Sequence, residues 1–466
     1  MRRVFNRTWL GYLSAMCLGA SAITLGRALE IFNGFFHPDA LNWLTAALLL
    51  CLIGVIAHRF VRGLSNAGVV AVSALLTAGI AWQIEQMLVA KSPGMYIKDT
   101  VRMWPFYTGV ILQGGLIAAG VAGVPAMRRI WFPAVLAVSL AIGVWMIKAS
   151  PNPYIDVVTV HKEALDAFLH HRDPYRISFE NIYGADSGLY YNPAAVIGKR
   201  LAIAYPYPPA SLIFAVPGHF LFGDFRYSEL AWLILGAGLI GFSRTSLSAK
   251  LAACLLLTTP RVWFVIEQGW TEPIAIFMLA LTVFLLIRNP IWASWAAGIL
   301  VVTKQYLGFT GLALLRLVWL RPSKWYWILF GMGFAAAAIT LPLALWHPNA
   351  FMRNVVWLQT QEPFRVDSLS YLSWAARRGM GQGTFMWAIG AAIAAAVVSV
   401  VVTRNTAGGF AAAVALTTFM MFAFGSKAFC NYYFFVIGAL CCTLAAFDTL
   451  ADRERAVQTS GTPATG

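Results

Sequence analysis

Residues 385–402 read FMWAIGAAIAAAVVSVVV and contain no charged side chain. At about 1.5 Å of rise per residue, a helix of this length spans most of a hydrocarbon core of roughly 30 Å. A membrane-spanning segment has to bond every backbone N–H and C=O internally, so it is either a helix or a strand of a closed barrel. Barrel strands alternate apolar and polar residues, and residues 391–402 do not alternate. The segment therefore predicts a transmembrane helix.

Similar apolar blocks recur along the chain. Hydrophobic residues make up 59% of the sequence and charged residues only 11%, whereas soluble domains carry about 25% charged residues. The blocks predict an all-α fold, a polytopic transmembrane bundle of about fourteen helices in contact with the lipid bilayer. The expected helices cover residues 8–29, 40–57, 66–90, 105–123, 129–148, 226–243, 249–266, 272–288, 291–303, 306–320, 325–346, 385–402, 408–425 and 430–448.

The net charge of +15 has two interpretations, and the position of the basic residues decides between them. A nucleic-acid-binding chain carries basic runs with interleaved aromatics, and we find none, so no nucleic-acid partner is expected. Lys and Arg here lie at the ends of apolar blocks, as they do in the cytoplasmic loops of membrane proteins. This rule predicts a multi-pass protein of the cell (inner or plasma) membrane with both termini inside. It places residues 149–209 and 347–384 on the periplasmic or extracytoplasmic side, and we expect 210–222 to be interfacial or re-entrant there.

Asp156 is the first candidate for chemistry. It follows the fifth apolar block and precedes an amphipathic pattern in which Val160, Ala164 and Phe168 share one helical face. An aspartate at a helix N-cap stabilises the helix by about 1 kcal/mol. A half-desolvated carboxylate at a membrane surface is also suited to act as a general base. The residues alone leave both roles open.

A second candidate is the polar pair Lys304 and Gln305, which interrupts an apolar stretch. A lysine at the centre of a membrane helix costs about 2.5–3.5 kcal/mol. It either extends to the interface or faces an internal site and meets an anion. Arg27 and Glu30 are i, i+3 neighbours and predict a pair on one helix face. No metal site is expected, because adjacent histidines such as those at 170–171 lack the i, i+4 spacing of helical ligands.

The order of several motifs resembles the GT-C membrane glycosyltransferases, most closely the polyprenyl-phosphate-mannose-dependent mannosyltransferases of glycosyltransferase family 87. The matching pieces are Asp156, RDPY at 172–175, YPYPP at 205–209, EQGWTEPIAIF at 267–277 and VTKQYLGFTGLALL at 302–315. The resemblance covers residues 150–320 well and 321–440 loosely. Three features depart from the family pattern. The acidic residue follows the fifth helix rather than the first, Arg172 replaces a glycine, and Gln305 replaces a proline.

The resemblance implies a GT-C-type bundle with amphipathic helices in its outer loops. Residues 1–128 would be additional transmembrane helices, and residues 129–346 the GT-C-like core with its catalytic outer loop 149–209. Residues 347–450 would form an outer loop and the C-terminal helices, and 451–466 a disordered cytoplasmic tail.

The resemblance also implies the reaction. A hexose, expected to be mannose, would pass with inversion from a polyprenyl-phosphate sugar donor to a glycan or glycolipid acceptor, without a cofactor. Asp156 would be the catalytic base. The donor phosphate would be bound by Lys304, Arg365 and Lys427. The sugar or acceptor would contact His161, Asp166, Tyr205, Tyr207, Glu267, Gln268 and Gln305. The alternatives are a transporter or flippase of a lipid-linked saccharide and a structural or assembly subunit.

Overall fold

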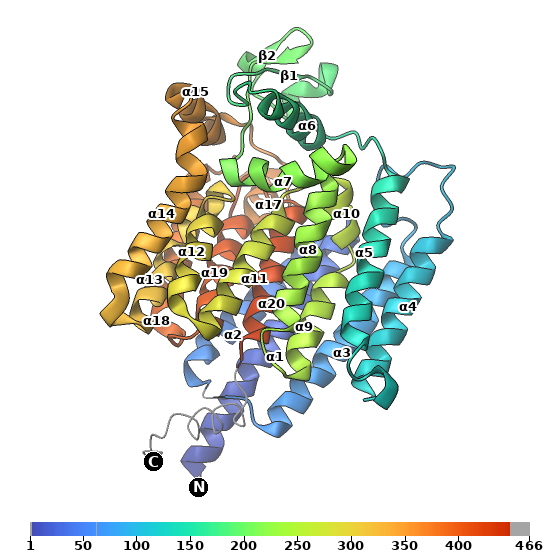
Figure 1. Cartoon of the computed structure of the whole chain (residues 1–466), viewed down its shortest axis with the longest axis vertical. Coiled ribbons are helices and arrows are strands. Elements are labelled where there is room, and N and C mark those ends of the chain that lie inside the picture. The colour runs from blue at the N-terminus through green and yellow to red at the C-terminus, as the bar shows by residue number, and fades with distance from the viewer. Residues whose placement is uncertain (1, 62, 448–466) are drawn as a thin grey trace.

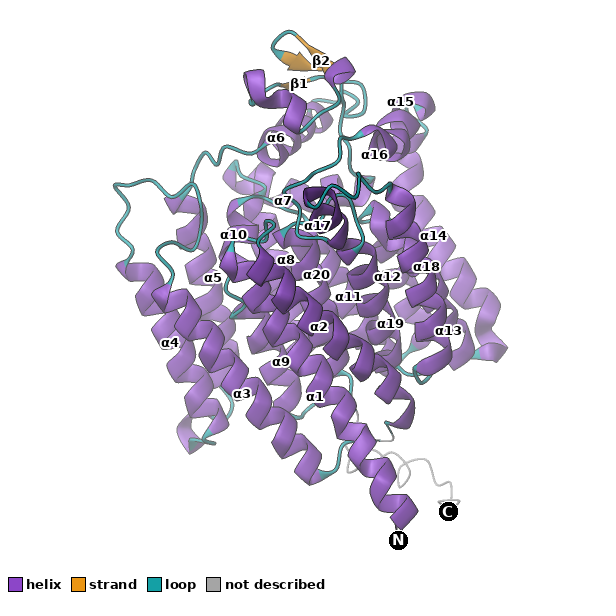
Figure 2. Ribbon diagram, turned by 180° about the vertical axis from the view of Figure 1, so that it is seen from behind, coloured by secondary structure: helices purple, strands orange, loops and turns teal. Residues whose placement is uncertain are grey.

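A computed structural model of the chain describes residues 2–61 and 63–447, with side chains from residue 12 onward. Most of its helices run side by side in one bundle (Figure 1, Figure 2). The short elements α6, β1, β2 and α15 lie together at one end of this bundle, and α1 starts at the other. We call the end of the bundle that carries α6 the α6 end. The predicted tail, 451–466, falls outside the described residues.

Seven of the described helices are long and apolar enough to cross a membrane. The candidate spans coincide with the following helices, apart from a few residues at one end of some of them: α1 (Arg2–Ile31), α2 (Pro38–Ala57), α3 (Asn66–Val89), α4 (Trp104–Val121), α5 (Trp131–Ala149), α14 (Trp325–Ala344) and α18 (Phe385–Val402). The all-α class is therefore confirmed, and these seven helices have the length and composition that a membrane span requires. The count of about fourteen and the GT-C arrangement stay predictions.

Shorter helices complete the bundle, some in its middle and others, such as α13, at its edge (Figure 1). These are α8 (Arg226–Gly241), α9 (Leu247–Leu257), α11 (Glu272–Arg288), α12 (Pro290–Val301), α13 (Gly311–Leu320), α19 (Ala407–Ala423) and α20 (Cys430–Ala445). Nearly every side chain of α19 and α20 is buried, as expected for helices that are apolar all round. Gly438 of α20 lies against Ile276 of α11, where an added Cβ would be 2.7 Å from a side-chain carbon. The glycine therefore allows α11 and α20 to approach closely.

The first helices pack onto the last one. α1 contacts α2, α3 and α20. The turn after α1 contains Gly34, with a φ of 76°, and a Cβ there would lie 2.6 Å from the backbone nitrogen of Cys430. Both the left-handed backbone and the close approach require glycine. The predicted module 1–128 thus shares packing surfaces with the C-terminal helices, and its boundary stays a prediction.

Two predicted helices are interrupted. Residues 249–266 form α9 and a separate short helix, α10 (Val262–Glu267), instead of one helix. Pro260 lies in the break, where its missing N–H and its ring prevent a continuous helix. The predicted helix 306–320 begins as a 3-10 segment, Gln305–Thr310, before α13 starts. Residues 302–304 separate that segment from α12, so Lys304 lies in a junction between helices, as predicted.

The predicted outer loops 149–209 and 347–384 both lie at the α6 end (Figure 1, Figure 2). The first contains α6 (Asp156–Leu169), whose buried face includes Val160 and Ala164, and a small antiparallel sheet that the sequence did not predict. Its strands, in the order β1-β3-β2, are β1 (Phe179–Glu180), β2 (Val196–Ile197) and β3 (Arg200–Leu201). Residues 209–222 form helix α7 (Pro209–Phe222), which contacts α6, α8 and α14.

The second loop is also partly helical. It contains α15 (Pro348–Met352), a π-helical segment (Arg353–Trp357), α16 (Leu358–Gln361) and α17 (Tyr371–Arg377). All six cysteines of the chain are buried and free, without a disulfide.

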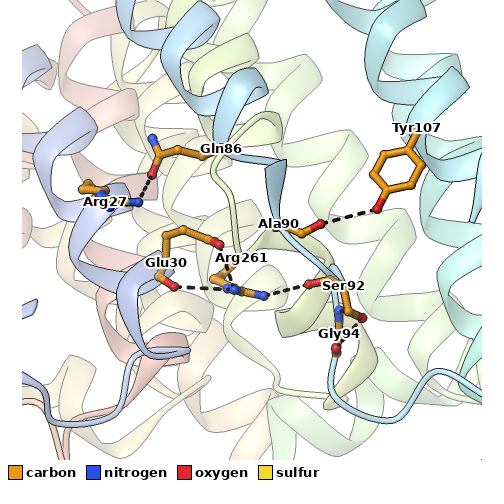
Figure 3. Close-up of polar contacts among 8 residues, drawn as sticks. All are labelled: Arg27, Glu30, Gln86, Ala90, Ser92, Gly94, Tyr107 and Arg261. Carbon is orange, nitrogen blue, oxygen red and sulfur yellow. Dashed lines mark hydrogen bonds and ion pairs between the residues drawn. The ribbon is translucent and has the colours of Figure 1, made fainter. Parts of the chain in front are cut away.

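The predicted Arg27–Glu30 pair is not formed, as Figure 3 shows. Arg27 donates to the side-chain oxygen of Gln86 at 3.3 Å, and Glu30 instead forms an ion pair of 2.8 Å with Arg261. Arg261 also donates to the backbone oxygen of Ser92 at 3.1 Å. Two helices, α1 and α3, are thereby joined to the turn before α10. We call these five residues the anchor cluster.

Candidate functional site

A cavity of about 330 Å³ lies at the α6 end, and we call it the polar chamber. Its walls come from connections far apart in the sequence: the turn after α1, the α3–α4 loop, the start of α6, the loop before β2, the α10–α11 connection, the α12–α13 junction, the loop between α16 and α17, and the loop between α19 and α20. Asp156, Lys304, Arg365 and Lys427 all line it. The fold therefore brings together the predicted base and all three predicted phosphate-binding residues.

Asp156 is the first residue of α6 and not its N-cap, which is Ile155. Asp156 therefore does not cap α6 as an N-cap residue would. The carboxylate accepts the N–H of Val157, the next residue, at 2.8 Å, and its other oxygen accepts the hydroxyl of Tyr191 at 2.6 Å. The backbone N–H of Asp156 donates to the hydroxyl of Tyr183 at 3.3 Å. Tyrosine hydroxyls, rather than the helix alone, therefore position Asp156 at the chamber wall.

The hydroxyls of these two tyrosines remain protonated. Burial, and then the nearby charge of Asp156, raise the pKa of Tyr191 and of Tyr183 above the ordinary tyrosine range. A carboxylate can accept about four hydrogen bonds, and the hydroxyl of Tyr191 uses only one of them. Asp156 therefore keeps oxygen lone pairs for a ligand. The half-buried carboxylate thus has room beside it and a fixed orientation.

Each of the three cations lies beside a carboxylate. The ammonium of Lys304 is 3.2 Å from Glu272, the first residue of α11, and 4.6 Å from the ring centre of Tyr207. Arg365 holds Asp367 through two hydrogen bonds of 2.9 and 2.7 Å. The ammonium of Lys427 is bonded to Glu362. In this state every cation of the chamber has a protein counter-ion.

A second cavity of about 350 Å³, the adjoining chamber, shares five lining residues with the polar chamber. The shared residues are Tyr207, Lys304, Glu362, Lys427 and Tyr432. Beyond them, apolar side chains from the start of α18, the end of α19 and two neighbouring loops share the wall with polar residues such as Gln359, Thr360 and Thr384. The apolar residues are Phe309, Phe364, Phe385, Ala388, Met421 and Phe422. Two lysines therefore lie where the polar chamber meets a chamber with a partly apolar wall.

Three further predicted residues lie at these cavities. Tyr207 lines both chambers, Gln268 lines the polar chamber, and Gln305 lines the adjoining one. The side chain of Gln305 donates to the backbone oxygen of Pro206 at 2.6 Å, which fixes the YPYPP segment beside the α12–α13 junction.

Four predicted ligand-contacting residues do not line either chamber, namely His161, Asp166, Tyr205 and Glu267. The carboxylate of Glu267 is fully buried and accepts the backbone N–H groups of Met95 and Tyr96 at 2.7 and 2.8 Å. Asp166 pairs with His219 of α7 at 2.8 Å. The prediction is corrected for these two because their carboxylates are already used to hold neighbouring segments in place.

His161 and Tyr205 pack beneath α6. The Nδ1 of His161 is 3.0 Å from the carbonyl of Val157, so Nδ1 must be the donor, and Nε2 therefore accepts the hydroxyl of Tyr205 at 3.0 Å. The imidazole stacks on Phe225 at 4.8 Å. Burial lowers the pKa of His161 to about 3, which keeps the ring neutral. These two residues support the start of α6 and do not contact the chamber.

The sequence did not point to Glu362, Tyr191 or Glu272. Glu362 lines both chambers and also a smaller cavity of about 70 Å³ on the other side of Asp156. A single acidic residue in a polar loop gives no pattern by which it could be selected. Glu272 lay within a quoted motif, and only the helix junction shows that it faces Lys304.

Among the described residues, no group of three or more His, Cys, Asp or Glu side chains is placed to hold a metal ion. No protein-family model, curated protein or solved structure matches the chain.

Proposed function

We propose that this chain is an integral membrane glycosyltransferase that moves a hexose, with mannose as the expected sugar, from a polyprenyl-phosphate donor to a glycan or glycolipid acceptor. The observation that carries the proposal is one cavity that is lined by a tyrosine-held aspartate and by three cationic side chains. We infer that this cavity opens on the extracytoplasmic side, because the basic residues predict the opposite end of the bundle to be cytoplasmic.

The residues suit an inverting displacement. An acceptor hydroxyl would attack the anomeric carbon, and Asp156 would take its proton. The bond between that carbon and the phosphate oxygen would break as the new glycosidic bond forms, and the polyprenyl phosphate would leave with the bonding electrons. Cationic side chains stabilise the charge that develops on the leaving phosphate. The donor carries its own leaving group, so no nucleotide site is required.

The two chambers match the two parts of such a donor. The apolar wall of the adjoining chamber suits the first isoprene units, and the polar chamber suits the sugar and the acceptor hydroxyl. Lys304 and Lys427 line both chambers, so the phosphate would lie between them. Arg365 lines only the polar chamber and would act on the sugar side of the phosphate. Tyr207, Gln268 and Gln305 would contact the substrates.

The test is sugar transfer by the purified full chain in lipid nanodiscs, using a polyprenyl-phosphate sugar labelled in the sugar and membrane glycans as acceptor. We expect label in the acceptor fraction and release of unsugared polyprenyl phosphate in equal amounts. Asp39→Asn is the matched control, because Asp39 is also a first-turn aspartate, at the start of α2, and is exposed. It should transfer at the wild-type rate.

The alternative, a transporter or flippase, makes a different prediction for the same purified protein. Wild-type protein in sealed vesicles would then move the labelled donor between leaflets without cleaving it. That result, with no label in any acceptor, would overturn the proposed transfer reaction.

A further inference from the structure

Glu362 has an unusual position among the charged residues of the site. It follows α16 directly, lines both chambers and the small cavity of about 70 Å³ beside Asp156, and bonds the ammonium of Lys427 with its carboxylate. Its side chain is 27% exposed and that of Lys427 is 22% exposed. The carboxylate therefore occupies the boundary between the two chambers, next to one of the two lysines that an incoming anion would contact.

The three ion pairs of the site differ in how easily the acid can leave. Glu272, the partner of Lys304, is fully buried at the start of α11. Asp367 is bonded at both oxygens by Arg365 and is two residues away on the same loop. Glu362 and Lys427, in contrast, come from two different loops. Separation of this pair needs only a movement of the segment that carries Glu362.

That segment, residues 358–364, has weak attachments, in contrast to the turn before it, where Asn354 is buried and donates to the backbone oxygens of Tyr175 and Ala350. It follows the π-helical turn Arg353–Trp357, and π-helical turns occur often at functional sites. Val356 and Trp357 are exposed. The backbone oxygen of Gln361 accepts a long hydrogen bond of 3.5 Å from Asn192. Burial lowers the pKa of Lys427, so its ammonium needs a counter-ion at all times, whether from the protein or from a ligand.

We propose that Glu362 is an internal counter-anion that holds the place of the donor phosphate at Lys427 and is displaced when the donor binds. The phosphate replaces the carboxylate on the ammonium, and residues 358–364 move away from the chamber boundary. The free site thus keeps Lys427 charged and the boundary closed, and only a ligand with an anionic group opens it. This inference rests on the proposed function, because it takes the incoming anion to be a lipid phosphate.

The test measures binding rather than transfer, with farnesyl phosphate and its uncharged counterpart farnesol as probes. Wild-type protein and the Glu362→Gln variant are compared in nanodiscs. If the internal pair keeps about nine-tenths of the protein closed, its removal should raise the affinity for farnesyl phosphate about tenfold. Affinity for farnesol should not change. Lys427→Met should reduce the preference for the phosphate, and Lys304 should retain part of it.

Glu163→Gln is the matched control. Glu163 is also an acid paired with a cation of the same loop region, Arg200, at 3.3 Å, but it lines none of the three cavities. Its affinity for farnesyl phosphate should equal that of the wild type. As a second measurement, farnesyl phosphate should increase amide hydrogen exchange in residues 358–364 of the wild-type protein, and farnesol should not.

The outcomes separate the two proposals. Wild-type binding of farnesyl phosphate with unchanged or weaker binding by Glu362→Gln would overturn the displacement, show a purely structural ion pair, and leave the proposed function standing. Binding of farnesyl phosphate by neither protein would overturn both proposals. Binding by Glu362→Gln that is tighter than that of the wild type, or that is seen in the variant alone, supports the displacement.

Discussion

Two groups of buried charges at the same end of the bundle serve different purposes. In the anchor cluster, Arg261 is bonded to Glu30 and to the backbone of Ser92 (Figure 3), and none of the five residues lines either chamber. In the polar chamber, Asp156 and Lys304 have partners too, but a cavity of about 330 Å³ lies beside them. Residue type does not distinguish the two groups. What distinguishes the polar chamber is the unfilled space beside its charged side chains.

The largest expected effect separates catalysis from support at Asp156. Asparagine keeps an oxygen that can accept the N–H of Val157, and its amide NH2 can donate to the hydroxyl oxygen of Tyr191, but it cannot take a proton from an acceptor. Asp156→Asn should therefore lower the rate of sugar transfer by about 10²–10⁴-fold while Tm stays at the wild-type value. Initial rates and a thermal melt on the same purified sample provide the measurement.

A near-wild-type rate for folded Asp156→Asn would place Asp156 with the supporting residues. Glu362 would then be the next candidate base, because it is the other carboxylate at the small cavity beside α6.

The second prediction concerns the anchor cluster. Arg261→Met leaves Glu30 buried without its counter-ion and should cost about 3–5 kcal/mol of stability. Arg27→Met removes only a bond to the neutral Gln86 and should cost about 1 kcal/mol. The double variant Arg261→Met, Glu30→Met should recover much of the loss. Thermal melts in nanodiscs rank the variants.

The comparison would fail if Arg261→Met kept its Tm and lost transfer activity. The anchor cluster would then belong to the reaction site rather than to the scaffold.

The third and smallest effect is a pH dependence of stability at His161, a residue that the sequence assigned to the site and the structure assigns to the scaffold. The folded-state pKa of about 3 lies below the ordinary value of 6.5. Below pH 6.5 the unfolded chain takes up a proton that the folded protein does not, so stability falls with acidification by about 1.4 kcal/mol per pH unit.

His161→Gln keeps an acceptor for Tyr205 and removes the titrating ring. Its Tm should change less than that of the wild type between pH 6.5 and pH 5, as followed by thermal melts. Equal slopes for the two proteins would mean that His161 is accessible to protons in the folded state.

The sequence was sufficient for most helices, because uninterrupted apolar blocks leave the backbone few alternatives in a bilayer. The sequence-based prediction failed where a single proline interrupts a helix or where a side chain pairs with a residue far away in the sequence. Pro260 breaks a predicted helix, and Glu30 prefers the distant Arg261 to the neighbouring Arg27. Helical spacing shows which side chains share a face, but not which other helix lies opposite.

For the site, the sequence provided the candidate residues but not their arrangement. Lys304 was selected because a charge is costly within an apolar stretch, and Asp156 because it lies between an apolar block and an amphipathic helix. Both residues line the polar chamber. His161 and Glu267 were selected by their position within motifs and are used for packing and anchoring. Glu362 was missed because its role depends on the convergence of two loops.

The six buried cysteines have a practical consequence. A water-soluble maleimide would find no accessible thiol on the folded chain, so the native protein already serves as an unreactive background for chemical labelling. A single thiol introduced at an exposed position such as Ala185 or Gln361 would then be the one modified group. Labelling of whole cells with such variants can show directly which compartment the α6 end faces.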